Sequence, residues 1–431
     1  MENAAPHPSA SKAFLSRIGA ALRTETGLVR LALGLVALHV ADDNFFQPAA
    51  GTSPGDHLVS GLVPIAILAL VAWLYPRLRA GFRAATAMTF GAIAIAVGAP
   101  AAYYLAKGIP SGDAFTGLLA LAAGIGLLLS GPVTLWRHRR RGGSRRRRYL
   151  RRTLTLIGGL VAAILVAWFV VFPVGASYVF THAGRTASTP ELGVTAAEVT
   201  VTTSDSLELQ AWYVPSKNRA AVVVYPGATR AKQARMLIEH GYGVLLLEAR
   251  GQGESEGDVD RWAGDRDLLA GAAFLRNRPD VDPERIGGIG FSVGGELLLE
   301  AAARSTAFAA IVSEGAGERI GEVDASGPER LLAEPAMAVM TAAMSVFSNH
   351  GPPPAIVDRI GLIAPRPVFL IYADPGIGGE STRQPKYFDA AGEPKAIWKV
   401  PDAGHTGGLD AAPAEYERRV VGFFDQSLLD R

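Results

Sequence analysis

The sequence predicts an α/β protein with a mostly parallel, doubly wound sheet, preceded by an all-α transmembrane region of about five helices. The chain of 431 residues is long enough for two domains, and 49% of its residues are hydrophobic. Its mean hydropathy of +0.21 is high for a soluble protein. Long apolar segments divide residues 1–176, whereas the rest of the chain alternates short apolar runs with helical stretches. These observations indicate a membrane region followed by an α/β domain.

The membrane region follows a polar lead, residues 1–26, which lacks the cleavage site of a signal peptide. Beyond it, the segments that approach or reach the ~20 apolar residues needed to cross a bilayer are residues 27–41, 58–75, 85–106, 114–136 and 154–176. The first segment is short and contains Arg30 and His39, which a bilayer core disfavours. We therefore expect a transmembrane region over residues 27–176.

The basic residues of this region predict its orientation. Arg77, Arg79 and Arg83 lie between the second and third segments, and an arginine-rich run, residues 137–152, lies between the fourth and fifth. Because basic loops stay in the cytoplasm, the N-terminus is predicted inside and the C-terminal domain outside. The run is typical of stop-transfer charge and also suits anionic lipid headgroups. Nucleic-acid binding is not expected, since these arginines separate apolar segments.

Cofactor and metal sites are not expected. The chain has no cysteine, which excludes disulfides and thiolate metal sites. His39 and Asp43 have the i, i+4 spacing of a metal-ligand pair, but polar residues at a membrane interface explain them equally well. No further cluster of ligand residues accompanies them. The prediction is therefore that neither a metal nor a cofactor is bound.

A linker at residues 177–189 leads into the α/β domain, residues 190–431. Residues 198–203 and 207–214 alternate with period two, which predicts antiparallel strands. Continuously apolar runs then predict buried parallel strands at residues 220–225, 244–247, 285–289, 309–312, 367–372 and 396–400. Helices are predicted at residues 230–240 and 263–276, after the fifth of these eight strands, and at the C-terminus. Active residues of such a sheet lie beyond the carboxyl ends of its strands.

Ser292 follows a predicted strand and precedes a run of strong helix formers, residues 296–303. The strand must therefore turn sharply into the helix at this serine. Gly290 and Gly294 lack the bulk that would prevent so close a passage. A serine in this position, above a helix N-terminus, is typical of a nucleophile elbow, and the N–H of Val293 can stabilise an oxyanion there.

Residues from about 190 to 431 resemble an α/β-hydrolase, in the branch of serine aminopeptidases, acyl-peptide hydrolases and lysophospholipase-like enzymes. That fold orders its catalytic residues as nucleophile, acid and histidine. His405 lies in a glycine-bounded loop after the last predicted strand, where an imidazole can take the proton of the serine. The resemblance thus implies that Ser292 is the nucleophile and His405 the general base.

The third triad member is left open between two residues near the seventh strand. Asp374 lies directly at the strand end, whereas Glu380 follows a glycine-rich turn and has the longer side chain. Glu380 is the preferred choice, with Glu314, after the sixth strand, as a minor alternative. The acid would hold the histidine tautomer and stabilise the imidazolium.

The resemblance also implies an oxyanion hole and a lid. Pro226-Gly227-Ala228 occupies the place of a His-Gly-x motif, so the Ala228 N–H is expected to join that of Val293. Arg250 lies in an Arg-Gly-x-Gly-x-Ser stretch that is expected to brace the loop near the elbow. Residues 316–360, between the sixth and seventh strands, are expected to form a small lid.

These features predict a membrane-anchored serine hydrolase that cleaves an ester, a thioester or a small peptide amide. Its expected partners are that small-molecule substrate and the lipid bilayer, whereas its oligomeric state is left open. The alternative is a membrane binding or scaffolding protein whose hydrolase domain has lost turnover. A transporter with an appended domain is the third hypothesis, although the apolar segments show no evident inverted repeat.

Overall fold

The computed structural model describes residues 24–108, 112–138, 145–182, 189–322, 327–374 and 376–430. These residues divide into two compact units. The first unit lies within Met1–Pro48 and Ser53–Val179, and the second within Ala49–Thr52 and Phe180–Arg431.

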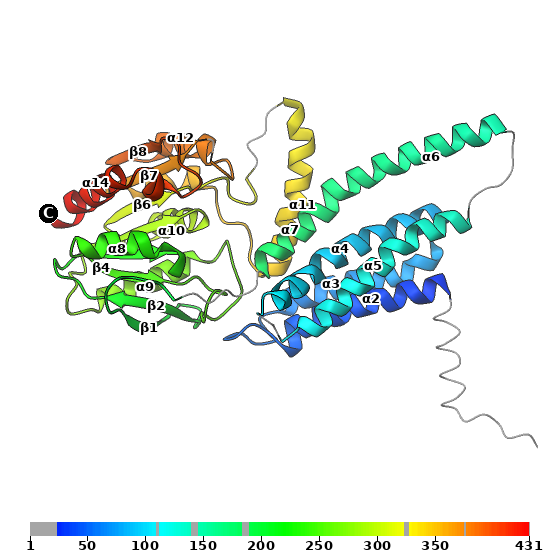
Figure 1. Cartoon of the computed structure of the whole chain (residues 1–431), viewed down its shortest axis with the longest axis horizontal. Helices are drawn as coiled ribbons and strands as arrows, with labels where there is room; N and C mark the ends of the chain where they lie inside the picture. The colour runs from blue at the N-terminus through cyan, green and yellow to red at the C-terminus, as the bar shows by residue number, and fades with distance from the viewer. Residues whose placement is uncertain are drawn as a thin grey trace, which may run out of the picture. The chain divides into compact units, whose positions relative to one another are not determined.

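The first unit is helical (Figure 1). Its main helices are α2 (Glu25–Ala41), α3 (Leu58–Leu74), α4 (Ala80–Ala106), α5 (Ala114–Arg137) and α6 (Arg145–Val166). A short π-helical turn, η3 (Ala167–Val171), continues α6 into α7 (Phe172–Thr181). Many large apolar side chains of these helices are exposed, including Leu62 on α3, Leu129 on α5 and Leu156 on α6. Exposed apolar helix surface of this extent is typical of segments that face lipid.

Helices α4 and α5 pack through glycine. A Cβ atom on Gly98 of α4 would lie 2.5 Å from the backbone nitrogen of Leu121 and 2.6 Å from the carbonyl oxygen of Gly117. On Gly91, a Cβ would come within 2.6 Å of the Leu128 nitrogen. Only glycine allows the two backbones to approach so closely, as is usual where helices associate within a bilayer.

Five described helical stretches are long and apolar enough to cross a membrane: Leu58–Arg77, Ala80–Ala106, Ala114–Arg137, Tyr149–Thr181 and Gly327–Ser348. The first four overlap the second to fifth predicted segments. The first predicted segment, residues 27–41, falls in α2, whose 17 residues are fewer than the ~20 that a crossing needs. The fifth stretch lies in the predicted lid.

The second unit is built on an eight-stranded sheet with the order β1-β2-β4-β3-β5-β6-β7-β8. The strands are β1 (Ala197–Thr202), β2 (Glu208–Val214), β3 (Ala221–Tyr225), β4 (Gly243–Leu247), β5 (Ile286–Phe291), β6 (Ala310–Glu314), β7 (Val368–Ala373) and β8 (Lys395–Val400). Strand β2 pairs antiparallel with β1 and with β4, and all the other pairs are parallel. All eight predicted strands are present.

Helices cover both faces of this sheet (Figure 1). One core contains side chains of α9 (Asp265–Arg276), α10 (Val293–Arg304) and α12 (Glu380–Ala390). The other contains side chains of α8 (Ala231–Glu239) and α14 (Pro413–Phe424), the latter preceded by the short α13 (Gly408–Ala411). Central strands are buried on both faces, which explains why β3 and β4 read as continuous apolar runs.

The region between β6 and β7 contains one long helix, α11 (Arg330–Ser348), and two short 3-10 turns, η6 (Ile356–Asp358) and η7 (Ile360–Ile363). Residues 323–326, within the predicted lid, lie outside the described residues. Ile356, Ile360 and Ile363 are buried against the core below α10. The end of this region is therefore attached to the body of the domain.

Candidate active site

Ser292 lies between β5 and α10 with φ of 54° and ψ of −125°, a conformation that L-residues other than glycine rarely adopt. The neighbouring glycines explain how the chain tolerates it. A Cβ on Gly290 would collide with the carbonyl oxygen of Gly294, and a Cβ on Gly294 would lie 2.9 Å from the carbonyl oxygen of Tyr225. The strand therefore turns directly into the helix, and the serine is presented at the carboxyl edge of the sheet.

His405 follows β8 and brings its ring to the serine. Its Nε2 atom lies 2.8 Å from Ser292 Oγ, although 113 residues separate the two in sequence. Its Nδ1 atom lies 2.9 Å from Glu380 Oε1. Three side chains from the ends of β5, β7 and β8 are thus joined in one chain of hydrogen bonds.

Glu380 opens α12 and is fully buried, at 0% exposure. Its carboxylate also accepts the backbone N–H groups of Ile377, at 3.0 Å, and Ala373, at 3.3 Å. Gly376 allows the backbone to pass this close to the carboxylate, because its φ is +64° and a Cβ there would collide with the Glu380 carboxylate. The carboxylate is therefore fixed before any substrate arrives.

The two other predicted acids lie elsewhere. Asp374 is exposed and forms an ion pair with Lys399 on the surface. Glu314 is buried, and its carboxylate accepts the N–H of Gly408 at 2.9 Å and the hydroxyl of Tyr416 at 2.6 Å. Burial raises the pKa of Glu314, while these hydrogen bonds oppose the rise. Of the three acids, the structure brings only Glu380 to His405.

The predicted oxyanion donors differ in their surroundings. Val293 is the first residue of α10, where N–H groups have no acceptor within the helix. The Ala228 N–H instead donates to Glu248 Oε2, at 3.1 Å, and is therefore already occupied. The sequence predicts that the Ala228 N–H joins that of Val293; in this structure it donates to Glu248, whose side chain comes from the end of the neighbouring strand β4.

Glu248 follows β4 and is 8% exposed. Burial raises the pKa of its carboxyl group, and the hydrogen bonds from Ala228 and Ala249 oppose this rise. Gly227 lies against the same side chain, since a Cβ on Gly227 would lie 2.8 Å from Glu248 Oε2. A buried acid therefore sits directly beside the turn that the sequence assigns to the oxyanion hole.

Two residues that contact the site, Glu248 and Gly315, were not predicted from the sequence. Besides Glu248, Gly315 makes room for the histidine, because a Cβ there would lie 3.2 Å from His405 Cε1 and 2.8 Å from Thr406 Cγ2. Gly315 directly follows β6 and has a φ of +72°, so a glycine after a predicted strand was the only signal. Arg250, by contrast, lies where a bracing residue is expected, with its guanidinium bonded to Asp267 and Asp205.

No group of three or more histidine or acidic residues that could hold a metal occurs within the described parts of the chain. His39 Nδ1 lies 3.3 Å from Thr116 Oγ1 and 3.8 Å from Asp113 Oδ2, and its Nε2 lies 3.3 Å from the Tyr178 hydroxyl. This buried histidine is thus held by hydroxyl and carboxylate partners within the helical unit.

The sheet order, the antiparallel β2 and the strained serine after β5 form the arrangement that hosts a nucleophile elbow. A family model described as X-Pro dipeptidyl-peptidase (S15 family) matches residues 185–353. The C-terminal unit has the α/β-hydrolase fold. The matched stretch includes Ser292 and ends before Glu380 and His405, so it covers one member of the hydrogen-bonded chain.

Curated relatives match the same part of the chain, the unit with the α/β-hydrolase fold. The protein YfhR of Escherichia coli (strain K12), described as uncharacterized, is 24% identical over 255 residues, which are 54% of this chain and 82% of YfhR. The thiohydrolase aneE of Aspergillus aculeatus is 34% identical over 119 residues, 25% of this chain and 37% of aneE.

Solved structures similar to the α/β-hydrolase unit include two further proteins. The esterase Pf2001 of Pyrococcus furiosus has a TM-score of 0.46 and 21% identity, and the match covers 57% of this chain and 99% of that one. The α/β hydrolase GrgF of Penicillium has a TM-score of 0.44 and 21% identity, and the match covers 55% and 99%.

Proposed function

We propose that this protein is a membrane-anchored serine hydrolase with Ser292 as nucleophile, His405 as general base and Glu380 as the acid that orients the histidine. The observation that carries the proposal is the pair of contacts on the two ring nitrogens of His405, at 2.8 Å to Ser292 and 2.9 Å to Glu380. With Nδ1 protonated and bonded to the carboxylate, Nε2 is left free to accept the proton of the serine hydroxyl.

In the proposed reaction, Ser292 Oγ attacks the carbonyl carbon of the substrate as His405 takes its proton. The carbonyl π electrons move onto oxygen, where the Val293 N–H stabilises the oxyanion. The imidazolium then protonates the leaving group as the bond to carbon breaks, which yields an acyl-enzyme. Water, deprotonated by His405, releases the acid and restores the serine.

The proposed substrates contain an ester, a thioester or a small peptide amide. The family description supports an amide and the name of the thiohydrolase aneE a thioester, so the comparisons favour the reaction class rather than one bond. Kinetics on p-nitrophenyl and thiophenyl esters of graded chain length, set against peptide p-nitroanilides, will rank the three bonds. Cleavage of none of them would contradict the proposal.

The experiment that tests the nucleophile is labelling with a fluorophosphonate. The full chain and a Ser204→Ala control, which alters an exposed turn serine, are expected to react, whereas Ser292→Ala is not. The Ser292→Ala melting temperature should stay close to that of the wild type, because the half-buried hydroxyl contributes chemistry more than packing. Labelling of the Ser292→Ala chain would exclude Ser292 as the nucleophile.

A second candidate function is a binding or scaffolding protein without turnover. It is favoured by the hydrogen bond from Ala228 to Glu248, because a site with one occupied oxyanion donor stabilises the transition state less. Fluorophosphonate labelling with no hydrolysis of any ester, thioester or anilide would support it.

The proposed partners are a small-molecule substrate and the lipid bilayer, with no nucleic acid and no cofactor. Anchoring is supported by the four apolar helices between Leu58 and Thr181 that are long enough to cross a membrane. The basic loops argue for a cytoplasmic N-terminus and a catalytic domain on the outer face of the cell membrane.

A further inference from the structure

Helix α11 of the α/β-hydrolase unit differs from the helices that cover the sheet. The stretch that contains it, Gly327–Ser348, is long and apolar enough to cross a membrane. None of the described side chains of α11 belongs to the two hydrophobic cores on the faces of the sheet. Figure 1 shows α11, in yellow, standing away from α9 and α10. The apolar character of α11 is therefore not explained by packing on the sheet.

The exposed face of α11 is apolar. Four exposed side chains at helical spacing form an apolar stripe: Leu331, Pro335, Ala338 and Ala342. Charges occur only in the first turns of the helix, where Arg330 pairs with Glu334, and residues 335–348 carry none. Helices that are apolar on all sides are found inside protein cores or inside membranes. Since α11 is not part of a core of the sheet, its composition indicates contact with lipid.

Both serines of the charge-free part are satisfied within the helix. Ser345 Oγ donates to the carbonyl oxygen of Thr341 at 2.9 Å, and Ser348 Oγ donates to that of Met344 at 2.8 Å. A serine hydroxyl bonded in this way to the preceding turn needs no water. Such bonds allow serine to be accommodated in helices surrounded by lipid.

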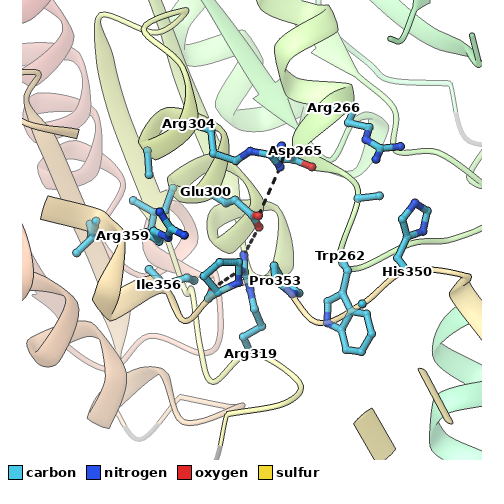
Figure 2. A pocket seen from close by; sticks show the side chains of 16 residues that line it. Trp262, Asp265, Arg266, Glu300, Arg304, Arg319, His350, Pro353, Ile356 and Arg359 are labelled. Carbon is cyan, nitrogen blue, oxygen red and sulfur yellow. Dashed lines mark hydrogen bonds and ion pairs between the residues drawn. The ribbon is translucent and has the colours of Figure 1, made fainter. Parts of the chain in front are cut away.

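The chain on either side of α11 is fixed to the body of the unit. Before the helix, Arg319 is 2% exposed, and its Nη2 lies 2.8 Å from Glu300 Oε2 on α10. After the helix, Ile356 is buried in the core. Figure 2 shows these three residues around one pocket of the unit. Gly327 is eight residues beyond Arg319, and Ile356 is eight residues beyond Ser348.

These short connections exclude a full crossing of the bilayer by α11. At about 1.5 Å per residue, the 19 residues of α11 measure about 28 Å, close to the thickness of the hydrocarbon core. If one end of the helix lay across the bilayer, a connection would have to return through the hydrocarbon as irregular chain. Lipid-exposed irregular backbone does not occur there, because its N–H and C=O groups would lack partners. The arrangement that remains is a helix lying within one leaflet.

The proposed anchoring keeps the unit close to such a surface. Sixteen residues separate Thr181, which ends the last apolar stretch of the helical unit, from Ala197 at the start of β1. Extended chain of this length reaches at most about 58 Å. A tether this short gives α11 a high effective concentration at the bilayer, which favours even weak insertion.

We propose that α11 lies in the membrane interface, with the apolar stripe among the acyl chains of the leaflet that faces the α/β-hydrolase unit. The unit then contacts the bilayer through its lid as well as through its tether. This proposal rests on the membrane anchoring of the proposed function, and not on hydrolysis at Ser292.

The test uses a fluorescent label on a single introduced cysteine, because the chain has no cysteine of its own. Ala338→Cys places a nitrobenzoxadiazole label on the apolar stripe, and Ser204→Cys, in an exposed turn, is the matched control. The full-length chains are reconstituted in phosphatidylcholine nanodiscs, whose two faces both meet water. Lipids with a nitroxide on the acyl chain quench a label in hydrocarbon, whereas iodide quenches a label in water.

The nitroxide lipids should quench the label at position 338 at least about twofold more than the label at position 204, since an interfacial helix lies at the boundary of headgroups and acyl chains. Iodide should quench the two labels in the opposite order. Equal nitroxide quenching at both positions would overturn the proposal. A label at position 338 that neither quencher reaches would show that protein, such as a second copy of the chain, covers the stripe, and would overturn it too.

A charged variant tests the contact with lipid in a second way. In the labelled Ala342→Cys chain, Ala338→Glu should lower nitroxide quenching to the level of the Ser204→Cys control, because a carboxylate is disfavoured among acyl chains. Ala338→Leu has a similar size without the charge and should retain the quenching. Both changes alter an exposed side chain, so the melting temperatures should stay close to that of the wild type. Equal quenching in the two variants would count against insertion.

The same experiment separates this proposal from the anchoring on which it rests. A full-length chain that does not enter nanodiscs contradicts the anchoring, and this proposal with it. A chain that enters nanodiscs but leaves the label at position 338 in water contradicts the insertion of α11 alone.

Discussion

Asp374 and Glu380 are only six residues apart, yet their surroundings differ completely. Glu380 is fully buried, with two backbone N–H groups and His405 on its carboxylate, whereas Asp374 is paired with Lys399 at the surface. A carboxylate that orients a catalytic histidine must be fixed relative to the ring, and only Glu380 meets this condition.

We therefore expect Glu380→Gln to lower kcat by about two to four orders of magnitude, because an amide no longer holds the histidine tautomer or stabilises the imidazolium. Asp374→Asn serves as the matched control and should change kcat by less than about threefold, since its exposed ion pair contributes little. Steady-state kinetics on one ester with both variants checks this, and the reverse ranking would contradict the triad.

Glu248 gives a second prediction at the scale of single residues. Removing its carboxylate frees the Ala228 N–H, and one oxyanion donor is worth about 2.7–4 kcal/mol in the transition state. Glu248→Ala should therefore raise kcat, and Glu248→Gln, which retains a carbonyl acceptor, should raise it less. The measurement compares kcat and the melting temperature of the wild type with those of both variants. A lower kcat in both variants, at unchanged melting, would mean that Glu248 assists catalysis.

At the scale of elements, the contact of α4 with α5 depends on the absence of side chains. Gly98→Val places new atoms against the backbone of Leu121, and overpacking of this kind costs about 1–3 kcal/mol. Gly126→Val on α5 is the control, since nothing lies within 4 Å of a Cβ there. Thermal unfolding of the detergent-solubilised chain should show a lower midpoint for Gly98→Val alone. Equal midpoints would argue against close packing of these helices.

The segment that follows α11 carries a pH-dependent contact. His350 Nδ1 lies 2.8 Å from Asp260 Oδ2, and this hydrogen bond raises the pKa of His350 while burial opposes the rise. A histidine whose pKa is raised by folding adds stability that is present below its unfolded pKa. This stability is lost as the pH rises through the folded value.

Asp260→Asn removes the charge but keeps the oxygen that accepts the N–H groups of Trp262 and Ala263. The melting temperature of the variant should therefore lie further below that of the wild type at about pH 5.5 than at about pH 8.5. Melting curves of both chains at the two pH values check the sign. A larger loss at the higher pH would show that the ion pair does not stabilise the fold.

The strands could be predicted from the sequence because burial on both faces leaves continuous apolar runs between polar turns. Ser292 could be predicted for a similar local reason, since its two glycine neighbours are close in sequence. The hydrogen bond from the Ala228 N–H to Glu248 could not be predicted, because Glu248 follows another strand, β4, and reaches Ala228 only in the folded sheet. The choice of Glu380 likewise depended on how the turn at Gly376 folds back.

At the scale of the whole molecule, the proposed topology places the α/β-hydrolase unit outside the cytoplasm. Arg77, Arg79 and Arg83 and the run of residues 137–152 would otherwise have to be translocated, which basic loops resist. A protease added to intact cells or spheroplasts should then remove residues 177–431, while a cytoplasmic marker enzyme stays intact. If this domain is cleaved only after the membrane is permeabilised, the domain lies in the cytoplasm and the proposed topology is wrong.

The hydrogen bond between Ala228 and Glu248 makes the carboxylate a tethered competitor of the substrate oxygen. In the proposed mechanism, only molecules whose Glu248 has withdrawn offer both oxyanion donors. The apparent affinity for a transition-state analogue then equals the intrinsic affinity multiplied by the fraction of molecules in this form. A ligand or membrane surface that favours withdrawal would raise the activity without touching Ser292. The proposed hydrolase would then be less active whenever this hydrogen bond is formed.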